Sequence, residues 1–76
     1  MSLIPFNRVS YSRLVVAGEC LHRLLVLGDL CDQAFGGHTG QWVRLIVRMY
    51  RGSEIPDHIG LALDDIEQSA LSMLNT

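Results

Sequence analysis

The spacing of apolar residues between Arg13 and Phe35 constrains the fold of this chain more than any other feature. Small and apolar side chains recur there at alternating steps of three and four residues, which places them along one face of an α-helix. A second apolar row lies beside the first, so we predict a helix over residues 13–35 that is buried on more than one side. The first row consists of Ala17, Cys20, Leu24, Leu27, Cys31 and Ala34.

Two glycines, Gly18 and Gly28, lie inside this predicted helix, where each costs about 1 kcal/mol relative to alanine. Either they let another backbone approach closely, or they are tolerated without a role. A strand fits only short apolar runs such as Leu24–Leu27, and the whole stretch is too long to be one strand. The helix therefore remains the prediction.

Two further helices are predicted after a turn at residues 36–40, where three of the five residues are glycine. Residues 41–51 carry apolar rows on two sides and arginines at steps of four and three on the remaining face, which favours a helix over a strand. Residues 56–74 begin with a proline, which is typical of a first helical turn. They carry one apolar face opposite one acidic face, as an amphipathic helix does.

Residues 1–9 contain Pro5, which blocks a helix, and we expect them to form a short arm. The predicted fold class is all-α, with residues 1–76 forming a single domain of three helices. Of these residues 49% are hydrophobic and only 18% are charged, which is more apolar side chain than a lone unit of this size can bury. We therefore expect a homodimer whose interface acts as a second core.

The first apolar row suggests how two copies would meet, because its residues are small at both ends and large in the middle. A twofold axis between Leu25 and Val26 would set two antiparallel copies of the helix against each other. The alternative is that this row faces the other two helices of its own chain. The dimer would pair Ala17 with Ala34, Cys20 with Cys31 and Leu24 with Leu27.

The sequence also indicates where the chain works. No stretch reaches the roughly 18 uninterrupted apolar residues of a membrane helix, and residues 1–10 lack the basic start and apolar block of a signal peptide. We therefore expect a cytoplasmic protein. All six basic residues are arginine, which fits the GC-rich coding sequences of many bacteria and phages.

The histidines and cysteines do not have the spacing of metal ligands. Cys20 and His22 are two residues apart, which points them to different sides of a helix, and His38 and His58 lie in separate turns. Cys20 and Cys31 would be about 16 Å apart along one helix, too far for a disulfide. No stretch combines a nucleophile with a base and an orienting group. We expect no metal, no cofactor and no enzymatic activity.

Arg44, Arg48 and Arg51, which we call the arginine stripe, form the most distinctive polar feature. The stripe could be an electropositive edge for an acidic protein or for nucleic acid. It could also be a solvated face that pairs with the acidic residues of the third helix, and the closeness in sequence and matching spacing of those residues favour this interpretation. A helix-turn-helix is disfavoured because the would-be recognition helix contains acidic residues and no Arg or Lys. The acidic residues concerned are Asp64, Asp65 and Glu67.

Two hypotheses for the function follow. In the first, the protein is a small regulator of bacterial or phage type that binds and inhibits an unidentified protein partner, as its excess of apolar side chains suggests. In the second, a dimer binds nucleic acid through the arginine stripe. The formal net charge of -2 argues against nucleic acid as the main partner.

Overall fold

The computed structural model describes residues 11–75, and the arm expected at residues 1–9 lies outside them. The described chain contains a 3-10 turn, η1 (Tyr11–Arg13), followed by three α-helices. These are α1 (Glu19–Phe35), α2 (Gly37–Met49) and α3 (Asp57–Leu74). The prediction of an all-α chain with three helices is therefore confirmed for residues 11–75. Among the described helices, none has both the length and the apolar character needed to cross a membrane.

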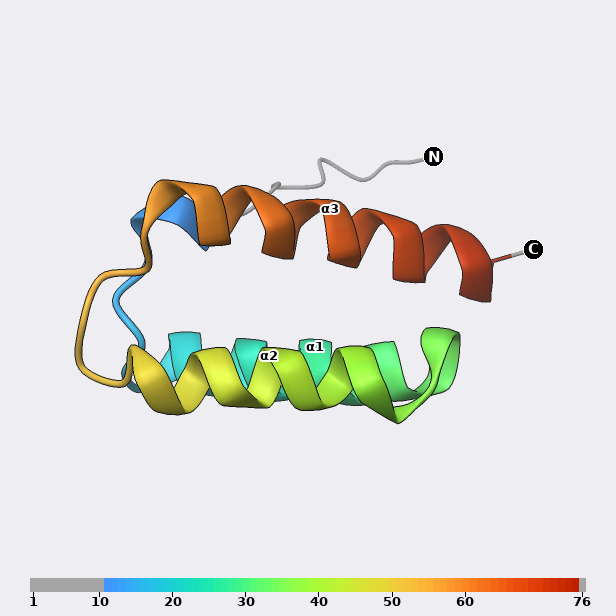
Figure 1. Cartoon of the computed structure of the whole chain (residues 1–76), viewed down its shortest axis with the longest axis horizontal. Coiled ribbons are helices and arrows are strands. Elements are labelled where there is room, and N and C mark those ends of the chain that lie inside the picture. The colour runs from blue at the N-terminus through green and yellow to red at the C-terminus, as the bar shows by residue number, and fades with distance from the viewer. Residues whose placement is uncertain (1–10, 76) are drawn as a thin grey trace.

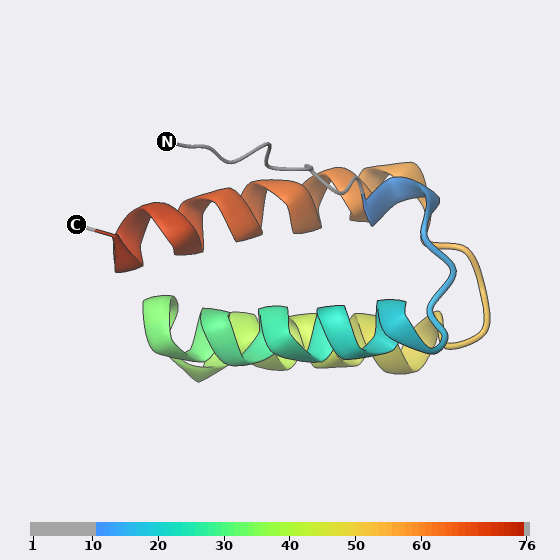
Figure 2. The ribbon, with the colours of Figure 1, turned by 180° about the vertical axis from the view of Figure 1, so that it is seen from behind.

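The helices form two layers (Figure 1). α1 and α2 lie antiparallel and side by side in one layer, and α3 lies over them together with η1. The view from behind shows the same arrangement with α1 in front (Figure 2). Within the described chain, α3 packs on η1 and on α1, whereas α2 makes no comparable contact with α3. Within residues 11–75, α2 and α3 therefore meet mainly through side chains of the shared core.

Two connecting segments, residues 14–18 and 50–56, join the layers at one end of the molecule and run side by side (Figure 1). Backbone hydrogen bonds between them hold the pair together, with donor–acceptor distances of 2.7 to 3.2 Å. The layers are thus tied together at this end by backbone as well as by side chains. The N–H groups of Val16, Gly52 and Ile55 donate to the carbonyl oxygens of Ser53, Val16 and Leu14, respectively.

The first helix begins at Glu19, six residues later than the predicted 13–35. Residues 14–16 belong to the connecting segment instead. The backbone groups of Leu14 and Val16 form hydrogen bonds with those of Gly52, Ser53 and Ile55. Gly18 follows with φ 58°, in the left-handed region that favours glycine. Gly18 is therefore the residue that redirects the chain into α1, and it does not lie inside the helix.

The second helix begins at Gly37 and ends at Met49, whereas 41–51 was predicted. Gly36 alone, at φ 91°, reverses the chain, so the glycine-rich segment after it is already helical. The helix ends early because Arg51 joins the connecting pair, bridging to Val16. The third helix starts one residue after the predicted position 56 and ends at the predicted Leu74.

η1 docks on α3 through a close backbone contact. A Cβ atom placed on Gly60 would overlap the backbone of Ser12, so only glycine permits this approach. The backbone N–H of Tyr11 also donates to Oδ1 of Asp64 at 3.3 Å. Tyr11 itself has no exposed surface and belongs to the core cluster. The core lies between the layers and includes Tyr11, Val16, Leu24, Leu27, Cys31, Val43, Ile46, Val47, Ile55 and Leu63.

Gly60→Ala tests this contact. We expect it to lower the free energy of unfolding by about 1–3 kcal/mol, the usual cost of forcing extra volume into a packed contact. Gly37→Ala is the matched control, since a Cβ there meets nothing within 4 Å. It should be neutral or stabilising by up to about 1 kcal/mol from helix propensity. Urea denaturation measures both, and equal stability of the two variants would contradict the docking.

Candidate functional site

The apolar row predicted to form the dimer interface lies largely in the core of the single chain. Leu24, Leu27 and Cys31 are buried between α1 and the rest of the molecule. Ala17 precedes α1 and is exposed. For these three side chains the alternative interpretation applies, because they are buried within their own chain. A second copy could reach them only if the layers separated. Cys20 and Ala34 are partly buried.

The arginine stripe does not act as one unit. Arg44 is partly buried against α1, Arg48 is exposed on α2, and Arg51 lies beyond the end of α2 in the connecting segment. None of the three forms an ion pair with the acidic residues of α3 in the described chain, so the pairing expected for a solvated face is wrong. Only Arg44 and Arg48 share a face of α2.

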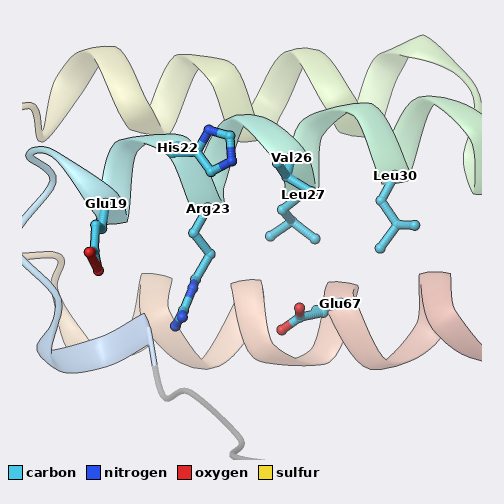
Figure 3. Close-up of a pocket in the computed structure, with 7 residues that line it drawn as sticks. All are labelled: Glu19, His22, Arg23, Val26, Leu27, Leu30 and Glu67. Atoms are coloured by element: carbon cyan, nitrogen blue, oxygen red, sulfur yellow. The ribbon is translucent and has the colours of Figure 1, made fainter.

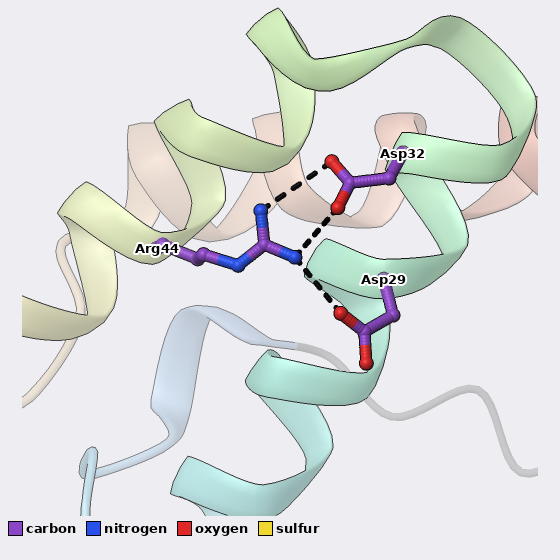
Figure 4. A network of polar contacts seen from close by, with 3 residues as sticks. All are labelled: Asp29, Asp32 and Arg44. Carbon is purple, nitrogen blue, oxygen red and sulfur yellow. Dashed lines mark hydrogen bonds and ion pairs between the residues drawn. The ribbon is translucent and has the colours of Figure 1, made fainter.

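Arg44 is held by two carboxylates of α1 (Figure 4). Its Nη2 lies 2.8 Å from Oδ1 of Asp29 and 2.7 Å from Oδ2 of Asp32, and its Nη1 donates to Oδ1 of Asp32 at 3.4 Å. The two-pronged contact with Asp32 fixes the plane of the guanidinium group. The contacts lie on the face of the α1–α2 layer that points away from α3, which is behind them in Figure 4.

The two helices approach closely at the same place, through Gly28 on α1 and Gly40 on α2. Both glycines are buried. A Cβ atom on Gly40 would lie 2.9 Å from the carbonyl oxygen of Gly28 and would overlap the carboxylate of Asp32. The close approach therefore depends on Gly40, whereas a Cβ atom on Gly28 would make only ordinary van der Waals contact with Arg44, at 3.5 Å. The short distance between the helices lets Arg44 reach both carboxylates.

The ion pair shifts the pKa of both partners. The hydrogen bond from Arg44, helped by its positive charge, holds the pKa of the Asp32 carboxyl below its usual value. The hydrogen bonds that Arg44 donates to Asp32 and, second, to Asp29 raise the pKa of Arg44. Because the pKa of Asp32 is lowered by folding, its contribution to stability is present at neutral pH and is lost as the pH falls through the lowered pKa.

An open groove runs beside this ion pair on the same face, with a volume of about 560 Å³. Two leucines supply its apolar surface, Leu25 from α1 and Leu45 from α2, and they are 42% and 49% exposed. Arginine side chains from α2 lie next to them. We call this the outer groove, and its lining residues are Leu25, Gln41, Arg44, Leu45, Val47 and Arg48.

A second groove, of about 470 Å³, lies between α1 and α3 (Figure 3). Arg23 extends from α1 toward α3, with Glu19 on one side and Glu67 on the other. With one arginine and two glutamates, the charged side chains that line this groove carry a net negative charge. Tyr11 lies near Arg23 and Glu67 of this groove, and its buried hydroxyl has no hydrogen-bond partner by distance and angle among residues 11–75. Burial raises the pKa of Tyr11, and the charge of nearby Glu67 raises it further.

The cysteines and histidines are not gathered into a site. Cys20 and Cys31 are free thiols, and burial raises the pKa of both, which disfavours the reactive thiolate. Within residues 11–75, no three side chains of the metal-binding types lie close enough together to hold an ion. The outer groove therefore remains the best candidate site.

Comparisons with protein-family models, with curated proteins and with solved structures found no match.

The sequence analysis found Arg44 and Arg48 but missed the other half of this site. Asp29 and Asp32 were given no role there. Their spacing of three residues placed them on one face and was a usable signal. Leu25 was used only to place the twofold axis of the expected dimer. Only the position of α2 against α1 reveals that Leu25 lines a groove.

We expect the Asp32 carboxyl to titrate with a midpoint below its ordinary value of about 3.9. Arg44→Gln should move that midpoint upward, because the donor that stabilises the carboxylate is lost. Arg48→Gln is the control and should leave it unchanged, since Arg48 forms no ion pair with Asp32 in the described chain. Carboxyl-detected NMR measures the midpoint. An ordinary midpoint in the unmodified protein would rule out the ion pair in solution.

Proposed function

We propose that this protein is a small, non-enzymatic, cytoplasmic regulator of bacterial or phage type. It acts as a homodimer, and it binds and inhibits another protein by direct contact. The contact is made by the outer groove. The partner contributes an apolar side chain that packs on Leu25 and Leu45, and an acidic group that meets Arg48.

The observation that carries this proposal is the combination of exposed leucine and arginine in the outer groove. Leucine side chains that are nearly half exposed on both walls of a groove give an apolar surface that a partner can cover. Arginine is enriched at protein interfaces, because it can pair with carboxylates while its stem packs on apolar surface. Both types of group lie within one groove here.

The two arginines of the groove play different parts. Arg44 is already paired with Asp29 and Asp32. Its side chain is therefore held in place as part of the groove wall, and its charge is largely neutralised. Arg48 is exposed and forms no ion pair within residues 11–75. It is therefore the group from which an acidic partner would gain most. This difference narrows the predicted stripe of three arginines to one principal contact.

The second candidate function is nucleic-acid binding. Its support is that α2 contains arginines and no acidic residue, and that Arg48 and Arg51 are both exposed. Against it, Asp29 and Asp32 lie on the same face as Arg44 and would repel phosphates. The protein-binding function accounts for the exposed leucines, which phosphate binding does not require.

The test uses a matched pair of exposed leucines. Leu25→Asp places a charge in the outer groove, and Leu61→Asp places one on the outer face of α3, where Leu61 is 61% exposed. Tagged proteins of each kind are incubated with lysate of the source organism, after circular dichroism has shown equal helix content. We expect the unmodified protein and Leu61→Asp to capture the same protein, and Leu25→Asp to lose it. Equal capture by all three would refute the role of the groove.

A salt series separates the two candidate functions. Binding to a random-sequence DNA duplex would weaken steeply as salt rises, because phosphate contacts release counterions. An apolar contact with a protein should depend on salt only weakly. Steep salt dependence, together with loss of duplex binding in Arg48→Gln, would favour the nucleic-acid function over the one proposed.

A further inference from the structure

The two ends of the outer groove carry opposite charges. At one end, two carboxylates, those of Asp29 and Asp32, share the single guanidinium group of Arg44, so one negative charge is left in excess. The side chain of Asp29 is 74% exposed, which makes that charge accessible to another molecule. At the other end, Arg48 is exposed and forms no ion pair among residues 11–75.

The apolar part of the groove lies between these charges along the helix axis. α1 and α2 are antiparallel, and a Cβ atom on Gly40 would lie 2.9 Å from the carbonyl oxygen of Gly28, so these two glycines are level. Arg48 follows Gly40 on α2 and lies about 12 Å from it, toward the start of α1. Leu25 lies about 6 Å from Asp29 in the same direction, on one face of α1. The order along the groove is therefore acidic, apolar and basic.

A helix is the form of partner that fits this groove. Its walls are two helices whose backbone groups bond within each helix, so an extended segment would find no strand edge to pair with there. A helix satisfies its own backbone and can lie along the groove. Positions i+4 and i+7 of a helix share a face with position i and lie about 6 and 10.5 Å from it. These distances match those from Asp29 to Leu25 and to Arg48, given the length of the arginine side chain.

We propose that the outer groove binds an amphipathic helix of a partner protein, with a basic residue at i, a large apolar residue at i+4 and an acidic residue at i+7. The basic residue meets Asp29, the apolar residue packs on Leu25 and Leu45, and the acidic residue meets Arg48. This inference rests on the proposed function and names the kind of partner that it takes. Charge selects this occupant, because a helix with charge of one sign would be attracted at one end of the groove and repelled at the other.

Synthetic helices test the inference. The probe is a peptide of about 20 residues, long enough to form a helix in isolation, built from alanine and glutamine with Arg at i, Leu at i+4 and Glu at i+7. Added to the ¹⁵N-labelled full chain, it should shift the amide NMR signals of Leu25, Leu45 and Arg48. A scrambled peptide of the same composition, with these three residues on different faces, should bind about tenfold more weakly.

Charge reversal tests the order of the charges. Peptides with Arg at both charged positions, or Glu at both, should bind about fivefold more weakly than the mixed peptide, because one end is then repelled. Arg48→Glu makes both ends of the groove acidic, so the peptide with two Arg should then bind most tightly. Arg13→Glu is the control, because Arg13 is exposed on η1 in the other layer, and the mixed peptide should remain the tightest. Circular dichroism verifies that the variants keep their helix content.

The possible outcomes separate this inference from the proposed function. A mixed peptide that binds no better than the scrambled one would overturn the amphipathic helix. So would a mixed peptide that fails to bind while Leu25→Asp converts a dimer into a monomer, because a second copy would then occupy the groove. Neither result decides the capture of a protein from lysate, which compares Leu25→Asp with Leu61→Asp. If both variants capture that protein equally, the proposed role of the groove fails whatever the peptides do.

Discussion

The docking of η1 on α3 is the contact on which the rest of the structure depends. Tyr11 is fully buried, its backbone N–H bonds to Asp64, and Gly60 lets the chain at Ser12 lie directly against the helix. Because η1 leads straight into the segment that enters α1, this contact ties α3 to the α1 side of the molecule. Within residues 11–75, α2 has α1 as its close helical neighbour, and its buried side chains join the core that α3 covers.

The sequence predicted the three helices correctly, but it misplaced the first residues of two of them. Residues 56–74 were placed within one residue, because a proline start and a single apolar face define such a helix without tertiary contacts. The start of α1 was missed because residues 14–16 bond to a segment almost 40 positions away, which periodicity cannot reveal. The start of α2 was missed because glycine is read as a turn, although only Gly36 has the left-handed conformation that a turn here needs.

The candidate site, like the helices, was predicted from the sequence only in part. The regular spacing of Arg44 and Arg48 identified a basic face of α2, and the structure places both beside the outer groove. Their partners could not be predicted, because spacing does not tell which neighbouring helix a face meets. The acids of α3 were expected, but the close approach at Gly28 and Gly40 brings Asp29 and Asp32 to Arg44 instead. Within residues 11–75, the acidic residues of α3 therefore form no ion pair with α2.

The central claim is that the docking of η1 on α3 ties the two layers of the molecule together. Amide hydrogen exchange tests it most directly at the backbone N–H of Tyr11, which donates to Oδ1 of Asp64. The account predicts that this N–H exchanges slowly in the unmodified protein and faster in Gly60→Ala, where a Cβ atom pushes Ser12 away from α3. If the N–H of Tyr11 exchanges as fast as an exposed amide in the unmodified protein, η1 does not dock on α3 and the account is wrong.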